Sequence, residues 1–102
     1  MLPLEVLLLM ALTFHGVEDH YEYAACIIQH ESGWDDEALG AHGEIGLAQI
    51  KPTTGRWFAD MLGWSEGWQL ETQLWDPSTN LYLLAWGLAN GYDAHWTTAA
   101  GC

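Results

Sequence analysis

The sequence predicts a single, mostly α-helical domain with one small hairpin or loop lobe. In two stretches, apolar residues recur at positions i, i+3 and i+4, which places them on one face of a helix. These two faces consist of Ala24, Ile27 and Ile28, and of Leu81, Leu84, Ala85 and Leu88. Between them, residues 35–47 carry three glycines and no helical period, which predicts a loop or a small hairpin. A chain of 102 residues is long enough for one modest core.

The first helix is expected over about residues 3–14, with Pro3 at its start and Gly16 just after it. Its apolar run differs from a signal peptide, because no positive region precedes it, Glu5 interrupts it and no small-x-small cleavage site follows. The run is also too short to span a bilayer. We therefore expect this helix to belong to the fold.

Glycine and proline residues mark the remaining elements. A second helix is expected over about residues 18–32, and a third over 52–62, between Pro52 and Gly63. Residues 63–76 are expected to be irregular, with one helical turn at most. A fourth helix begins at Asp76-Pro77 and ends at Asn90-Gly91, and residues 93–102 resemble the opening of a further helix.

Composition excludes several classes of partner. The formal net charge is −12, with one lysine and one arginine, so the chain lacks the cations that nucleic acids and anionic membranes require. We expect neither nucleic-acid binding nor membrane insertion. Seven tryptophans fit a carbohydrate site, because their rings stack on sugars as well as pack cores.

The two cysteines, Cys26 and Cys102, permit one disulfide but do not imply one. Because Cys26 falls between apolar helix positions, the pattern favours a buried thiol there. The five histidines show no ligand-like spacing, so we expect no metal site and no cofactor.

Glu31 is the candidate catalytic residue. It follows Ala24, Ile27 and Ile28 on the same helix face, just before the helix ends at Gly33. Apolar packing and the negative end of the helix dipole both disfavour the ionised carboxylate. A carboxyl that stays protonated near neutral pH is what acid catalysis at a glycosidic oxygen needs.

Three motifs resemble the lysozyme-like superfamily, and most closely the soluble lytic transglycosylase (SLT) domain. Glu31-Ser32-Gly33-Trp34 resembles the family's catalytic Glu-Ser segment, and Gly46-Leu47-Ala48-Gln49-Ile50 with Pro52 and Thr54 resembles its Gly-Leu-Met-Gln-Ile-x-Pro-x-Thr block. Asp76-Pro77 through Asn80-Leu81 resembles the start of a later helix. The resemblance covers roughly residues 2–102, and the three motifs occur in the family's order and at similar distances.

The resemblance implies an α+β lysozyme-like fold and an enzyme that cleaves between N-acetylmuramic acid and N-acetylglucosamine in peptidoglycan, leaving 1,6-anhydro-muramoyl ends. Glu31 would act as general acid and base. Trp34 would stack on sugar or close the core, and both interpretations stay open. The expected substrate-binding residues are Ser32, Trp34, Gly46, Leu47 and Gln49.

One family feature is missing. The family's last motif contains a Tyr-Asn pair whose tyrosine reaches the catalytic glutamate, and the sequence stops at Cys102, before this pair. We therefore expect a single domain over residues 1–102 that is truncated at its C-terminal end, or a different partner for Glu31.

Two alternative functions follow. Glu44 or Asp35 would supply the second carboxylate of a hydrolytic muramidase, although each is also explained as a charged turn residue. A non-catalytic, wall-binding or structural module would fit the missing tyrosine and the negative charge. We expect action at the bacterial cell wall. The negative charge and the lack of a signal peptide suggest delivery in a phage particle or by a secretion machine.

Overall fold

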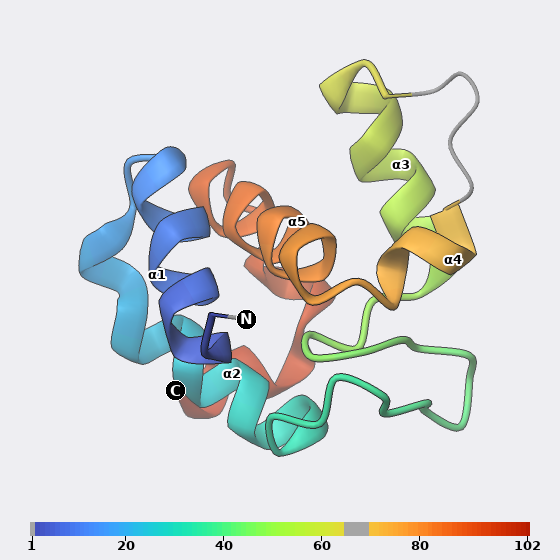
Figure 1. Cartoon of the computed structure of the whole chain (residues 1–102), viewed down its shortest axis with the longest axis horizontal. Coiled ribbons are helices and arrows are strands. Elements are labelled where there is room, and N and C mark those ends of the chain that lie inside the picture. The colour runs from blue at the N-terminus through green and yellow to red at the C-terminus, as the bar shows by residue number, and fades with distance from the viewer. Residues whose placement is uncertain (1, 65–69) are drawn as a thin grey trace.

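Five α-helices and three short 3-10 helices form the described residues, 2–64 and 70–102, of the computed structural model (Figure 1). The mostly α-helical class is confirmed. The elements in chain order are α1 (Leu4–Phe14), η1 (Glu18–His20), α2 (Tyr21–Ser32), α3 (Pro52–Leu62), α4 (Leu70–Leu74), α5 (Pro77–Ala89), η2 (Asp93–His95) and η3 (Thr97–Gly101).

Most expected helix boundaries agree with the structure to within a residue or two. The second helix starts later than expected, at Tyr21, because residues 18–20 form a 3-10 turn. Residues 93–102 form two 3-10 helices and no further α-helix. In the stretch predicted to be irregular, α4 occupies residues 70–74, whereas residues 65–69 lie outside the described residues.

The core lies between α1, α2 and α5. α1 and α5 pack side by side (Figure 1), and α2 packs against α1. The predicted face of α2 is buried, and so is the predicted face of α5. Phe58 of α3 joins the same core, with no exposed surface. Among the described helices, none is both long enough and apolar enough to cross a bilayer.

The predicted loop lobe runs from the end of α2 to the start of α3. Two isolated antiparallel bridges, Leu39 with Ile45 and Ile45 with Ile50, fold it back on itself. Gly46 allows this fold, because its φ is +75° and a Cβ there would lie 2.7 Å from the amide nitrogen of Asn80. The lobe is therefore a tight loop that is held against α5.

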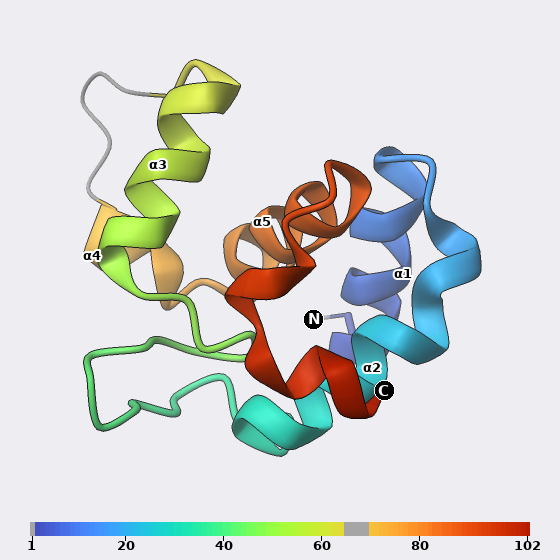
Figure 2. The ribbon, with the colours of Figure 1, turned by 180° about the vertical axis from the view of Figure 1, so that it is seen from behind.

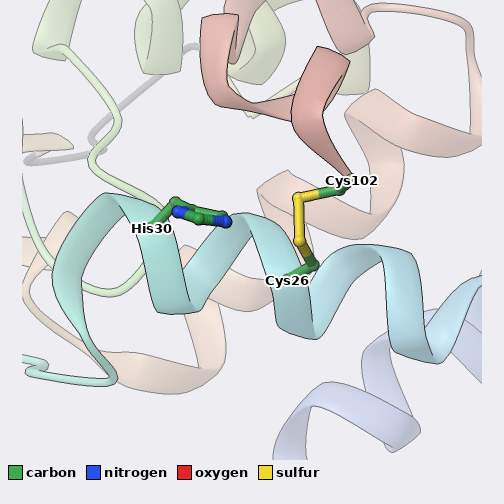
Figure 3. A group of neighbouring side chains, drawn as sticks. All are labelled: Cys26, His30 and Cys102. Atoms are coloured by element: carbon green, nitrogen blue, oxygen red, sulfur yellow. A yellow bond between two sulfur atoms is a disulfide. The ribbon is translucent and has the colours of Figure 1, made fainter.

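The prediction of a buried free thiol at Cys26 is wrong. Cys26 is half-buried and forms a disulfide with Cys102, at the end of η3, across 76 positions of sequence (Figure 3). The C-terminal segment lies against α2, as Figure 2 shows from behind, and this brings the two cysteines together. Helical spacing describes only the local face of α2, so it could not reveal a partner from a distant segment.

Candidate active site

Glu31 lies in the last turn of α2. The helix ends at Gly33, whose N–H donates to the carbonyls of Ile28 and Gln29 and whose left-handed φ of 61° turns the chain away from the helix axis. The Glu31 side chain is half-buried, and its Oε2 accepts a 2.7 Å hydrogen bond from the hydroxyl of Thr98 in η3. The carboxyl is thereby held between the end of α2 and the C-terminal segment.

Glu31 lines a cleft of about 310 Å³. Three segments form the remaining walls: the end of the loop lobe, the first turn of α3 and the C-terminal 3-10 segment. The lining residues are Glu31, Glu44, Gln49, Ile50, Lys51, Thr54, Ala94, His95, Trp96 and Thr97. Acidic, amide, hydroxyl and aromatic groups therefore converge on one hollow.

Asn80 fixes the loop wall of this cleft to α5. It is 1% exposed, and its Oδ1 accepts the N–H of Ala48 at 2.9 Å. Its Nδ2 donates to the carbonyls of Ile45 and Leu74, at 2.9 and 3.0 Å. One buried amide thus satisfies three backbone groups that would otherwise lie unpaired in the core.

Trp96 fixes the same loop to the C-terminal segment. Its ring is 3% exposed, and its Nε1–H donates to the carbonyl of Ala48 at 2.8 Å. Gly87 of α5 makes room for it, because a Cβ at Gly87 would lie 2.8 Å from the Trp96 ring. The loop wall and the C-terminal wall of the cleft are therefore directly connected.

Gln49 has a left-handed backbone, with φ at 50°, which is uncommon for a residue other than glycine. Its Nε2 donates to the carbonyls of Ala38 and Gly46, at 3.1 and 3.0 Å. These two bonds fix the side chain at the cleft wall, so its amide is oriented before any ligand enters.

Glu44 brings a second carboxylate into the cleft. Backbone hydrogen bonds, from its own amide and from that of His42, lower the pKa of the Glu44 carboxyl, and the charge of Lys51 acts in the same direction. The His42 N–H lies 2.7 Å from Oε1 of Glu44. Glu44 is therefore ionised at neutral pH.

Comparison with known families agrees with this geometry. The transglycosylase SLT domain family matches residues 16–100 of the chain. The chain belongs to this family. No curated protein and no solved structure gives a significant match. Members of the SLT family act on peptidoglycan, so a peptidoglycan glycan strand is the substrate class of this SLT domain.

The expected substrate-binding residues of the SLT domain divide into two groups. Gln49 lines the cleft, whereas Ser32, Trp34, Gly46 and Leu47 are not among its lining residues in the described structure. The Ser32 hydroxyl donates to the Leu47 carbonyl at 2.7 Å, which ties α2 to the loop. Leu47 is fully buried, and the half-buried Trp34 packs against the core. In this structure these four residues support the cleft.

Asp35 also lies away from the lining residues of the described cleft. Its Oδ1 accepts the N–H of Glu37 at 2.9 Å, as a turn residue does. Of the two cations, Lys51 lines the cleft and Arg56 does not. Neither forms an ion pair with an acidic side chain in residues 2–64 and 70–102.

Sequence reasoning missed the residues that the C-terminal segment contributes. Thr98 contacts Glu31, and Ala94, His95 and Thr97 line the cleft. The family resemblance implies a tyrosine partner for Glu31 and no residue of this segment. No local pattern indicates which side chain of that segment faces Glu31, which lies 67 positions earlier.

One group of side chains in the SLT domain has the composition of a metal site. Ligand atoms of Cys26, His30 and Cys102 lie within 4.8 Å of one another (Figure 3). Both sulfur atoms are bonded to each other, so neither offers the thiolate that a zinc ion requires. In the described structure this group is a disulfide with a histidine beside it.

Proposed function

We propose that this domain cleaves the β-1,4 bond between N-acetylmuramic acid and N-acetylglucosamine in peptidoglycan by lytic transglycosylation. The position of Glu31 carries the proposal. Its half-buried carboxyl lines a cleft of about 310 Å³ in an SLT domain, and Gln49, fixed on the loop lobe, lines the same cleft. General acid catalysis requires a carboxyl within hydrogen-bond reach of the scissile bond, and a carboxyl that lines the cleft has that access.

In the proposed reaction, protonated Glu31 donates its proton to the glycosidic oxygen, and the N-acetylglucosamine side departs. Ionised Glu31 then accepts the proton of the C6 hydroxyl of the muramoyl residue. The C6 oxygen bonds to C1 and closes a 1,6-anhydro ring. The proton returns to Glu31, so neither water nor a cofactor is consumed.

Lys51 is the one lysine or arginine among the described lining residues of the cleft, and its charge favours an anionic substrate there. A lysine ammonium binds the lactyl or stem-peptide carboxylate of a muramoyl unit by a charge-assisted hydrogen bond. The net charge of −12 opposes long-range approach to an anionic wall. We therefore include delivery to the wall, in a phage particle or by a secretion machine, in the proposal.

A hydrolytic muramidase is the second candidate, and the shared cleft of Glu31 and Glu44 favours it. Retaining hydrolysis uses a second, ionised carboxylate as nucleophile, whereas inverting hydrolysis uses it as base toward a water. The lowered pKa of Glu44 gives it the charge that either role needs. Asp35 has no comparable support.

Mass spectrometry of purified peptidoglycan after digestion tests these proposals. Transglycosylation yields anhydro-muramoyl ends, which are lighter by one water than the reducing ends that hydrolysis yields. We expect Glu31→Gln to lower the rate at least about a hundredfold. Glu22→Gln, an exposed acid on the same helix, is the matched control and should leave the rate unchanged.

Glu44→Gln separates the two enzymes. Continued formation of anhydro ends supports the transglycosylase, while reducing ends that disappear in this variant support the muramidase. If the wild-type domain binds glycan but releases no fragment, and Glu31→Gln does not alter glycan binding, both enzymatic proposals fail. The domain would then be a wall-binding module.

A further inference from the structure

The C-terminal segment is attached to α2 at two points. The first is the disulfide between Cys26 and Cys102, whose Cα atoms lie 5.8 Å apart (Figure 3). The second is the hydrogen bond from Thr98 to Glu31. Cys26 and Glu31 belong to the same helix, and Thr98 and Cys102 stand four positions apart. Along α2, the disulfide therefore lies five positions, or about one and a half helical turns, before the proposed catalytic carboxyl.

η3 buries little of its own surface. Among residues 97–101 only Ala99 is buried. At the two ends of η3, the Ala99 N–H donates to the Trp96 carbonyl and the Cys102 N–H donates to the Ala99 carbonyl, and 3-10 helices are weak on their own. Trp96 anchors the start of the segment, and Cys102 anchors its end. Thr98 lies between these two anchors.

Thr98 has the geometry to orient Glu31. Its hydroxyl donates a hydrogen bond to Oε2 of Glu31, so the other carboxyl oxygen is available to exchange the proton with substrate. A hydrogen bond from a residue that is itself held in place fixes a catalytic side chain in one rotamer, and small misplacements of such groups lower rates strongly. We infer that Thr98 is a positioning residue for Glu31 and that the Cys26–Cys102 disulfide holds Thr98 in place.

This inference rests on the proposed role of Glu31 and deepens it. The threonine hydroxyl provides the hydrogen bond that holds this carboxyl against the C-terminal segment. The disulfide is then a part of the active site's support, although neither sulfur touches the cleft.

Kinetics on soluble glycan strands test the role of Thr98. Thr98→Val keeps the shape and removes the hydroxyl, and we expect kcat to fall about tenfold. KM should change less than about twofold, because substrate binding does not use this hydroxyl. Thr98→Ser should restore most of kcat. Thr13→Val, which removes an exposed hydroxyl from α1, is the control. A wild-type kcat in Thr98→Val would overturn the inference.

A double-mutant cycle tests the role of the disulfide. We expect Cys26→Ser with Cys102→Ser to lower kcat, at a temperature where every variant is folded by circular dichroism. Adding these changes to Thr98→Val should lower kcat no further, because the disulfide acts through Thr98. If kcat of the combined variant falls by the product of the two separate decreases, the disulfide affects kcat by a route that does not involve Thr98.

Hydrogen exchange gives a readout that does not depend on activity. Loss of the disulfide should speed exchange at the Ala99 and Cys102 amides by a larger factor than at the buried amides of α5, whose exchange follows global unfolding. If the Ala99 amide exchanges no faster without the disulfide, the inference that the disulfide holds η3 in place is overturned. If the oxidised wild-type domain cleaves no glycan, the proposed function fails, and this exchange experiment still decides whether the disulfide holds η3.

Discussion

Asn80 on α5 accepts a hydrogen bond from the backbone N–H of Ala48, 32 positions earlier in the chain, at 2.9 Å. Its amide nitrogen also donates to the carbonyls of Ile45 and Leu74. This one side chain connects α5, the loop lobe and the end of α4. The loop wall of the cleft therefore has its position because of a buried polar group.

We predict that Asn80→Leu lowers the free energy of unfolding by about 3 kcal/mol or more, because three buried backbone groups lose their partner. Urea denaturation measures the loss. Asn90→Leu is the control, since Asn90 is exposed and, within residues 2–64 and 70–102, its side-chain amide bonds only the Trp86 carbonyl, so about 1 kcal/mol is expected. Equal losses in the two variants would contradict the role of Asn80.

Gly40→Ala should impair activity far more than stability. A Cβ at Gly40 would lie 2.6 Å from Oε1 of both Glu44 and Gln49, so both side chains must move from their places in the cleft. The backbone of Gly40 is not left-handed, so alanine itself is tolerated. We expect glycan cleavage to fall about tenfold with less than about 1 kcal/mol lost in stability. Ala41→Ser, at the exposed neighbouring position, should match the wild type in both measurements.

Tyr23 should make the domain sensitive to alkaline pH. Its hydroxyl donates to Asp93 at 2.6 Å, and this bond, together with burial and the carboxylate charge, raises its pKa from 10.0 to about 12. Because the unfolded chain ionises first, the stabilising contribution is complete below pH 10 and is lost between pH 10 and about 12. Melting curves across this range should show a smaller alkaline loss in Tyr23→Phe. In an absorbance titration of the wild type, the tyrosine that ionises at the highest pH should be Tyr23, and this step should be missing in Tyr23→Phe. An unchanged titration would contradict the raised pKa of Tyr23.

Reduction of the disulfide should lower the free energy of unfolding by about 2–4 kcal/mol, because it releases a loop of 76 positions in the unfolded chain. An excess of dithiothreitol supplies two electrons and two protons to the two sulfurs and becomes a cyclic disulfide itself. Urea midpoints with and without the dithiol measure the change. The Cys26→Ser, Cys102→Ser variant should not respond to the dithiol, and a wild-type midpoint that also stays constant would refute the prediction.

The sequence predicts the parts of the fold that depend on local signals. Pro52 and Gly63 bound α3, and the Asp76 side chain caps α5 by accepting the N–H of Thr79. The helix pattern and the family resemblance together predict Glu31 at the cleft, and the resemblance alone predicts Gln49. Both side chains line the cleft, where a helix end places Glu31 and a tight turn places Gln49.

Features that join distant segments were not predictable in this way. The disulfide links positions 76 apart, and Thr98 reaches a carboxyl 67 positions away. The apolar spacing around Cys26 predicts burial of its side chain. A free thiol and a disulfide sulfur can both be buried, so this spacing does not distinguish them. Ser32 was assigned to substrate, but its hydroxyl is directed to the Leu47 carbonyl, a partner that only the folded loop provides.

The bond between Cys26 and Cys102 has one more consequence, for the fate of the domain after a protease attacks it. The turn at Ala41 and His42 is exposed, and hydrolysis of a single peptide bond there would separate Glu31 from Gln49 along the backbone. Both pieces would still be joined through the two sulfurs. A nicked domain would therefore keep both walls of its cleft in one molecule, and the cut would become visible on a gel only after reduction.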